Sequence, residues 1–348
     1  MTDDLPSWAS DIEDVSQYVI TAHGLATNMP REGATGRSVH IGIIDSAYRL
    51  PGPVTEGRDV RGGPDHSFLE ADQEETRMHG RQVFDLISPY CPDATFSLYQ
   101  AVTEDGTLPL EAYSDAITAA IDDEVDLLNV SAGDPWPGPI RANPNVAETQ
   151  RAFDEGITVV AAAGNWKPKQ ENRPPVHCPA ALEDVIAVGG FVAHCPADPG
   201  EERSEEETGP YYIRLDSESE YREPVPNDAF CGQVGCIGGD SCLTNKSEVP
   251  WEYNAQPTGG KPDILAPVHV PIRDADGDRW LAAGSSFAAP IVTGSLARIL
   301  DELNRTDHRT ATPYRLREAI TGGAAPLDEG KQVKYDAMGV RRELGLVS

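Results

Sequence analysis

The chain has 348 residues, of which 39% are hydrophobic, so it can bury a substantial core as one large or two small domains. Its 57 acidic and 28 basic residues give a formal net charge of −29, which argues against nucleic acid as a partner because polyanions repel an acidic surface. No apolar stretch approaches the ~20 residues that cross a bilayer, so no membrane partner is expected.

The acidic residues are spread along the whole chain, and only six of the 28 basic residues are Lys. This pattern predicts a halophilic protein, because molar salt screens the repulsion between carboxylates to within roughly 3 Å. The alternative is an ordinary acidic protein. The start of the chain, Met1 to Pro6, is acidic and unlike a secretory signal, so we expect a cytoplasmic location.

The first half of the chain alternates between apolar runs and helical stretches. Residues 1–36 are interpreted as an N-terminal extension with a helix over 14–26, residues 37–345 as one domain and residues 346–348 as a tail. Strands are predicted at 38–44, 94–101, 125–130, 157–163 and 185–189. Helices are predicted from residue 79 and over 110–122 and 147–155, and a Pro- and Gly-rich loop over 51–64. Helical stretches of ~10 residues between strands predict β-α-β units, and therefore a three-layer α/β/α fold with a mostly parallel central sheet.

Residues 191–256 break this alternation and are interpreted as an acidic insertion. They contain 14 acidic and four basic residues and four of the six Cys. After them, residues 261–267 resume the core, a short strand is predicted at 280–283, and a helix over 287–303. Thr312 is expected to cap a further helix, because Pro313 suits its first turn.

The six Cys divide into two groups. Cys91 and Cys178 are isolated, so we expect buried free thiols. The four in the insertion can form disulfides, stay reduced or bind zinc, although their spacing is looser than in common zinc sites; they are Cys195, Cys231, Cys236 and Cys242. Residues 274–278 resemble only part of a calcium loop, and a hairpin turn is the better interpretation. No cofactor is required by any of these patterns.

Three residues far apart in the sequence suggest a chemistry together. Asp45 ends an apolar strand, His79 precedes Gly80, which permits close backbone approach, and Ser286 begins a helix rich in small residues. Separately, each has an ordinary structural explanation, as a turn Asp, a loop His and an N-cap Ser. A hydroxyl becomes a good nucleophile at neutral pH when an imidazole takes its proton and a carboxylate orients that imidazole. The combination therefore predicts a serine hydrolase.

Two further strand ends carry groups that suit the same reaction. Asn165 follows a run of Ala and Gly, where its amide can donate a hydrogen bond to an oxyanion. The segment Ser131, Ala132 and Gly133 ends another strand, where its backbone can pair with an extended peptide.

Together these segments resemble the subtilisin-like serine proteases (subtilases). The resemblance covers about residues 37–190 and 257–345 and is carried by four blocks: 284–290 (Gly-Ser-Ser-Phe-Ala-Ala-Pro), 162–165 (Ala-Ala-Gly-Asn), 128–133 (Leu-Asn-Val-Ser-Ala-Gly) and 261–267 (Lys-Pro-Asp-Ile-Leu-Ala-Pro). It implies a serine endopeptidase acting on peptide or protein substrates. Ser286 would be the nucleophile, His79 the general base, Asp45 the orienting carboxylate, and Asn165 and the Ser286 N–H the oxyanion donors. Ser131, Ala132, Gly133, Ala163 and Gly164 would bind substrate, and calcium would be a possible ligand.

The departures from the family pattern indicate a divergent branch. The family usually has Gly at the position of Ala47 and Thr or Ser at the position of Arg81. It usually has small residues at the positions of Phe84 and Asp85. The alternative to an enzyme is therefore an inactive subtilase fold that serves as a binding or regulatory module. A serine esterase of the α/β-hydrolase type is disfavoured, because that fold orders its triad Ser, Asp, His.

Two expectations concern specificity and control. The resemblance places His177 in the primary specificity pocket, which suggests tolerance of polar or acidic side chains; a surface loop His is the alternative. Only about 37 residues precede the first strand, too few for the ~80-residue propeptide of secreted subtilases. We therefore hypothesise that residues 1–25, or the insertion, restrain activity. The sequence predicts no oligomeric state.

Overall fold

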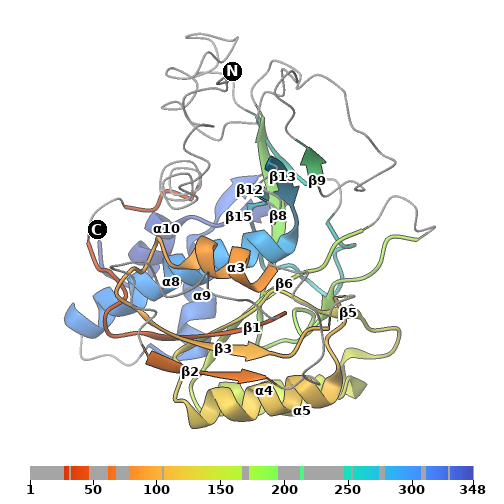
Figure 1. Cartoon of the computed structure of the whole chain (residues 1–348). Helices are drawn as coiled ribbons and strands as arrows, with labels where there is room; N and C mark the ends of the chain where they lie inside the picture. The colour runs from red at the N-terminus through yellow and green to blue at the C-terminus, as the bar shows by residue number, and fades with distance from the viewer. Residues whose placement is uncertain are drawn as a thin grey trace, which may run out of the picture.

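A ten-stranded sheet forms the centre of the computed structural model, and Figure 1 shows helices packed around it. The structure describes residues 27–30, 33–46, 62–67, 79–103, 106–166, 172–194, 212–214, 247–251, 254–273, 279–306, 311–327 and 330–347. The strands of this sheet are β1 (His40–Asp45), β2 (Gly62–Ser67), β3 (Thr95–Gln100), β4 (Leu127–Val130), β6 (Thr158–Ala162), β8 (Ile186–His194), β10 (Ser247–Pro250), β11 (Ile264–Pro267), β14 (Ala325–Leu327) and β15 (Gln332–Lys334).

The sheet is mostly parallel, as predicted. Its order is β14-β15-β11-β8-β6-β4-β1-β3-β2, with β10 paired to β8. All neighbours in this order pair in parallel except β14 with β15, and β10 also pairs with β8 in the antiparallel sense. The chain passes from β1 to β3 on one side and then returns across β1 to β4 on the other. The strand order therefore reverses at β1.

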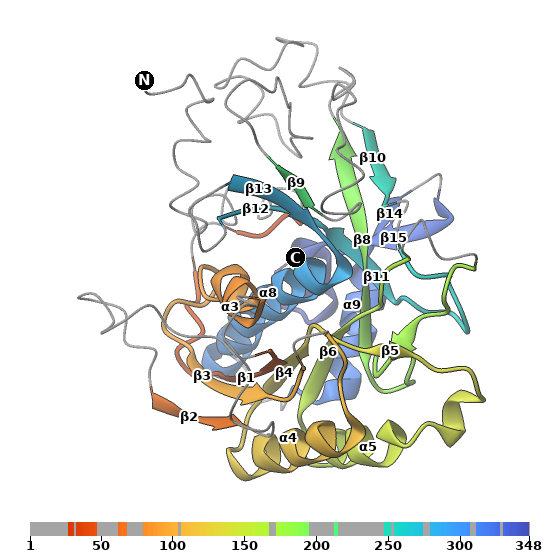
Figure 2. The same cartoon turned by 45° about the vertical axis from the view of Figure 1, so that its right-hand side comes forward.

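Helices cover both faces of the sheet (Figures 1 and 2). One face is covered by α4 (Leu110–Asp122) and α5 (Asn145–Asp154), and the other by α3 (His79–Ile87), α8 (Ser285–Thr306), α9 (Pro313–Gly323) and α10 (Ala337–Glu343). Strand β1 shows the division: Ile41 and Ile43 pack in the cluster of α3 and α8, whereas Ile44 packs in the cluster of α4. Successive side chains of a strand point to opposite faces, so a fully apolar strand fills two cores. The three-layer α/β/α prediction is confirmed.

Most predicted elements lie close to the observed ones, and α4 has the predicted bounds. Strand β2 was not expected, because residues 62–64 belong to a run of Gly and Pro predicted as a loop. A small antiparallel sheet of β12 (His269–Arg273), β13 (Arg279–Ala283) and β9 (Tyr212–Arg214) was also missed, apart from β13. β12 and β13 pair on either side of residues 274–278, which themselves lie outside the described residues.

Residues at both ends of the predicted insertion lie in the described fold. β8 continues to His194, and β10 pairs with it through Ser247 to Pro250. Trp251 and Ala255 are buried in the fold. Apolar residues at the ends of the acidic segment therefore belong to the core, where they complete the sheet. The four Cys of the insertion, like residues 1–26, lie outside the described residues. Cys91 and Cys178 are buried free thiols, as expected.

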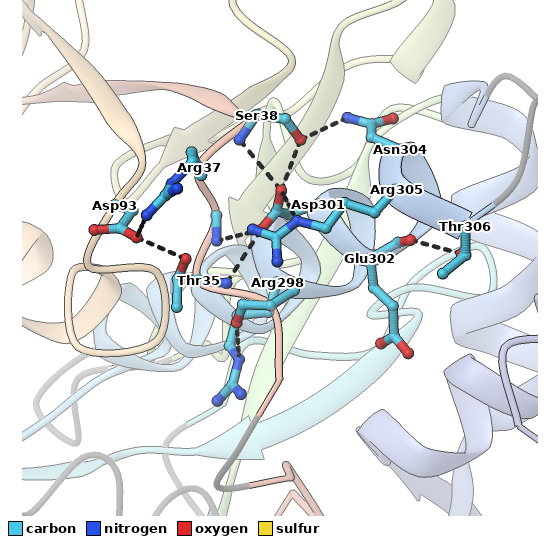
Figure 3. Close-up of polar contacts among 12 residues, drawn as sticks. Thr35, Arg37, Ser38, Asp93, Arg298, Asp301, Glu302, Asn304, Arg305 and Thr306 are labelled. Carbon is cyan, nitrogen blue, oxygen red and sulfur yellow. Dashed lines mark hydrogen bonds and ion pairs between the residues drawn. The ribbon is translucent and has the colours of Figure 1, made fainter.

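Residues 35–38, just before the first strand, are held against α8 by hydrogen bonds. The buried carboxylate of Asp301 on α8 accepts hydrogen bonds from the main-chain N–H groups of Thr35, Gly36 and Ser38 at 3.0–3.3 Å and from the Ser38 hydroxyl at 2.8 Å (Figure 3). Arg305, one turn further along the helix, binds the same carboxylate at 2.6 Å. Residues 35–38 are therefore fixed to α8 before the chain enters β1.

Both ends of the described chain meet against α8. The Thr27 carbonyl accepts the N–H of Ala337 at 2.8 Å, and Asn28 donates to Asp336 at 3.0 Å. Ser295, in the middle of α8, bonds the Tyr335 hydroxyl at 2.7 Å. None of the described helices, α8 included, has the length and hydropathy that crossing a bilayer requires.

Candidate active site

Asp45 lies at the point where the strand order reverses. It is the last residue of β1, between β3 and β4, and ligand sites of open α/β sheets lie at the carboxyl ends of strands at such a point. Its side chain is 3% exposed. Oδ1 accepts the Ser46 N–H at 2.7 Å, and Oδ2 has no hydrogen-bond partner in the described part of the chain. The carboxylate is thus fixed on one side by its own turn.

His79 begins α3 and bridges Asp45 and Ser286. Its Nδ1 lies 2.8 Å from Asp45 Oδ1, and its Nε2 lies 3.0 Å from Ser286 Oγ. The close approach depends on Gly80, because a Cβ on this residue would lie 2.6 Å from the Ser46 carbonyl oxygen. The Phe287 ring packs beside the imidazole, with ring centroids 5.4 Å apart.

The two hydrogen bonds of His79 determine what the group can do. With Asp45 accepting from Nδ1, the neutral ring presents the lone pair of Nε2 to the Ser286 hydroxyl. The imidazole is then placed to take the proton of the hydroxyl, and the carboxylate is placed to stabilise the imidazolium that results. The structure thus brings together three of the residues that the sequence singled out.

Ser286 lies in the first turn of α8, immediately after β13 and Gly284. The helix is anchored to the sheet about two turns further on, where the Thr293 hydroxyl donates to Asn129 Oδ1 at 2.9 Å. Asn129 also donates to the Ser131 hydroxyl at 2.8 Å. Through these bonds the position of the Ser286 helix is linked to the end of β4.

Asn165 lies next to the same helix start, and Ser285 fixes its amide. The N–H and the hydroxyl of Ser285 donate to Asn165 Oδ1 at 3.0 and 2.9 Å, and the same hydroxyl accepts the Gly164 N–H at 3.1 Å. The amide oxygen is occupied by these bonds, so the NH₂ group remains as a donor near Gly284, where an added Cβ would lie 3.6 Å from Nδ2 and 3.1 Å from Ser286 Oγ. A group with these donors can bind a developing oxyanion.

The other predicted substrate-binding residues extend two adjacent strands. Ser131, Ala132 and Gly133 follow β4, and Ala163 and Gly164 follow β6, which pairs with β4 in parallel. β5 (Asp134–Pro135) and β7 (His177–Cys178) then pair with each other, so these segments converge on His177.

His177 lies between the two extensions. Its Nδ1 donates to the Gly133 carbonyl at 2.9 Å, and its main-chain N–H donates to the Ala163 carbonyl at 2.9 Å. Burial lowers the pKa of the imidazole, outweighing the Gly133 carbonyl and the Asp134 charge, which act to raise it. Nε2 is buried and has no hydrogen-bond partner among the residues that the structure describes.

The metal predictions fall mostly outside the described residues. The four Cys of the insertion cannot be placed, and within the ranges that the structure describes no three or more His, Cys, Asp or Glu side chains group to bind a metal ion. Zinc and calcium therefore stay predictions, and no step of the chemistry is assigned to them.

Two residues with a role in this arrangement were not identified from the sequence. In the sequence, Ser285 is only part of the Gly-Ser-Ser turn. Its hydrogen bond to Asn165, 120 residues away, cannot be recognised from the neighbouring sequence. Thr293 likewise has no local signal, because its partner Asn129 lies 164 residues away. Only the adjacency of Ser285 to Ser286 could have drawn attention to it.

Comparison with known proteins finds a family model and several similar sequences. The model described as "Subtilase family" matches residues 73–339. The chain is 25% identical to the "Minor extracellular protease Epr" of Bacillus subtilis (strain 168) over 167 residues, which is 45% of this chain and 24% of that protein. It is 25% identical to the "Major intracellular serine protease" of the same organism over 178 residues, 47% of this chain and 54% of that protein. The chain thus spans between a quarter and about half of the length of these relatives.

Solved structures share the fold. A structure described as a lanthipeptide protease superposes with a TM-score of 0.62 at 18% identity, covering 98% of this chain and 99% of that one. The protease domain of PatA superposes with a TM-score of 0.58 at 17% identity, covering 90% and 98%.

Proposed function

This chain belongs to the subtilase family, and from that premise we propose that it is a serine endopeptidase, with peptides or proteins as substrates. The observation that carries the proposal is the position of His79, hydrogen-bonded to Asp45 through Nδ1 and to Ser286 through Nε2. A histidine with only a structural role has no need of both contacts.

The proposed reaction begins at Ser286. Its Oγ attacks the carbonyl carbon of the peptide bond while His79 Nε2 takes the hydroxyl proton, and Asp45 stabilises the imidazolium. The carbonyl oxygen becomes an oxyanion that accepts hydrogen bonds from Asn165 Nδ2 and from the Ser286 N–H, at the positive end of the α8 dipole. The imidazolium then protonates the leaving amine as the C–N bond breaks, which leaves an acyl-enzyme. Water, activated by the same imidazole, releases the acid and regenerates Ser286.

The working conditions are part of the proposal. The charge of −29 supports a protein that is folded and active in high salt. No metal or organic cofactor takes part in the proposed steps.

The proposal is tested by labelling with a fluorophosphonate in high salt. We expect covalent attachment at Ser286, identified by mass spectrometry of the peptide, together with cleavage of a casein substrate. Ser286→Ala should abolish both, and Ser114→Ala on α4 should leave both unchanged. A folded wild-type protein that neither labels nor cleaves would support the alternative, an inactive subtilase fold that acts as a binding module.

A further inference from the structure

The geometry around His177 points to a specificity determinant, and the inference rests on the proposed function. We infer that the His177 imidazole fills the cleft beside Ser286 and Asn165, so that the enzyme cleaves after residues with small side chains, Gly, Ala or Ser. The residue concerned is the one whose carbonyl is attacked (P1).

The place of the P1 side chain follows from the reacting atoms. The attacked carbon must be within bonding reach of Ser286 Oγ, with its oxygen directed to Asn165 Nδ2. The P1 α-carbon is one bond from that carbon, so its side chain starts beside the main chain that leads into Asn165, which is Ala163 and Gly164. The opposite boundary is the segment that extends β4, because β4 and β6 are adjacent.

The His177 ring occupies the space between these two boundaries. A Cβ placed on Gly164 would lie 2.4 Å from Cγ and Cδ2 of His177, which means that the ring lies directly against the Gly164 main chain. On the other side, a Cβ on Gly133 would lie 2.3 Å from the Cys178 carbonyl oxygen. The segment 177–178 thus contacts both extensions, and a long P1 side chain would have to displace it.

The ring is held in this position by three separate contacts. Nδ1 donates to the Gly133 carbonyl, the main-chain N–H donates to the Ala163 carbonyl, and β7 pairs with β5 opposite Pro135. Moving the imidazole aside costs the hydrogen bond to Gly133 and exposes the apolar face of the ring. The obstruction is therefore part of the folded structure.

The ring also offers no charge to an acidic substrate. The neutral imidazole is favoured because burial lowers its pKa. Asp134, directly after Gly133, adds a negative charge on the same side. The tolerance of acidic side chains that the sequence suggested is therefore replaced by a limit on size.

The inference is tested with peptides that differ only at P1, which is Ala, Leu, Phe or Glu. For the wild type we expect kcat/KM to be at least ~10-fold higher for Ala than for Leu or Phe, the range that a shape-limited pocket supplies. His177→Gly should raise kcat/KM for Phe relative to Ala by at least ~10-fold. His177→Gln, which keeps most of the volume, should keep the preference for Ala, and so should the matched control His40→Gln at the start of β1.

Active-site titration with the fluorophosphonate separates the two proposals. Labelled wild-type enzyme that prefers Phe or Leu, or labelled His177→Gly with the wild-type preference, overturns the role of His177 alone. Absence of labelling in the folded wild type overturns the proposed function and this inference with it. If His177→Gly does not fold, the P1 preferences of the wild type and of His177→Gln still test the inference. A preference for Leu or Phe at P1 in either protein contradicts it.

Discussion

Ser285 and Asn165 are joined by two hydrogen bonds that end on one oxygen: the N–H and the hydroxyl of Ser285 both donate to Asn165 Oδ1, at 3.0 and 2.9 Å. The residue before the nucleophile thus sets the orientation of the amide beside it. Since Ser285 is fully buried, no water competes for these bonds.

Removing the Ser285 hydroxyl should weaken catalysis through Asn165. We expect Ser285→Ala to lower kcat about 10-fold with little change in KM, and Asn165→Ala to lower kcat about 10²–10³-fold. The double variant should be no worse than Asn165→Ala, because both changes remove the same donor. Steady-state kinetics on one peptide measure this, and Ser285→Thr should restore most of the loss. Additive losses would show that Ser285 acts independently of Asn165.

Changing Asp45 to Asn should disrupt the imidazole orientation while leaving the fold intact. An amide at this position no longer stabilises the imidazolium and can favour the wrong tautomer, so we expect kcat to fall by about 10⁴-fold at neutral pH. The matched control is Asp126→Asn, which changes a carboxylate that accepts the His40 N–H at 2.7 Å, away from the site. If both variants lose activity equally, the effect of Asp45 is structural.

The buried carboxylate of Asp301 should contribute strongly to stability. Burial acts to raise the pKa of this group, but hydrogen bonds from Ser38 and Thr35 and the charge of Arg305 outweigh it, so its pKa is lowered. Asp301→Asn should lower the free energy of unfolding by on the order of 3 kcal/mol, since it leaves buried donors and Arg305 unmatched. Denaturant unfolding in high salt measures the loss. Asp93→Asn, on a more exposed ion pair with Arg37, should cost about 1 kcal/mol or less, and an equal cost would contradict the prediction.

His177 should make stability depend on pH below about 6.5, the usual pKa of a free histidine. Its folded pKa is lowered by burial, so just below that pH the unfolded chain binds more protons than the folded one. The free energy of unfolding should therefore fall as the pH falls from about 6.5 towards the folded pKa. His177→Gln should flatten this part of the curve without changing the acid loss from Asp301, which begins at lower pH. If the free energy of unfolding depends on pH in the same way in the wild type and in His177→Gln, His177 is not the group responsible.

Salt should stabilise the protein. Raising ionic strength from about 0.1 to about 1 M shortens the screening length from about 10 to about 3 Å, which weakens repulsion within a net charge of −29. We expect the unfolding midpoint to rise steadily with KCl and to rise less with a neutral osmolyte such as sucrose at equal osmolality. An unfolding midpoint that does not change with KCl would favour the alternative interpretation, an ordinary acidic protein.

The fold could be predicted where sequence and structure obey the same local rule. β1, β3, β4, β6 and β8 are apolar runs buried on two faces, and α4 has helical periodicity between clear breaks. β2 could not be predicted, because Gly and Pro indicate a loop and the strand forms only by pairing with β3. β12 is similar: its pairing partner β13 determines its conformation.

The candidate site could likewise be predicted only where local sequence features indicate it. The contact of His79 with Asp45 and Ser286 could be predicted because each residue ends or begins an element, and the topology of a parallel sheet brings such ends together. Ser285 and Thr293 were not found, because their roles depend on partners 120 and 164 residues away. The orientation of His177 likewise depends on Gly133, on the neighbouring strand extension.

The anchoring of α8 by both ends of the described chain has a consequence for biosynthesis. Asp45 and His79 are synthesised well before Ser286 and before Tyr335, which bonds Ser295 on the same helix. A half-made polypeptide therefore contains an acid and a base but no attacking alcohol. Under the proposed function, a chain of this protein therefore gains its nucleophile only after the strands of the first half of the sheet have been synthesised.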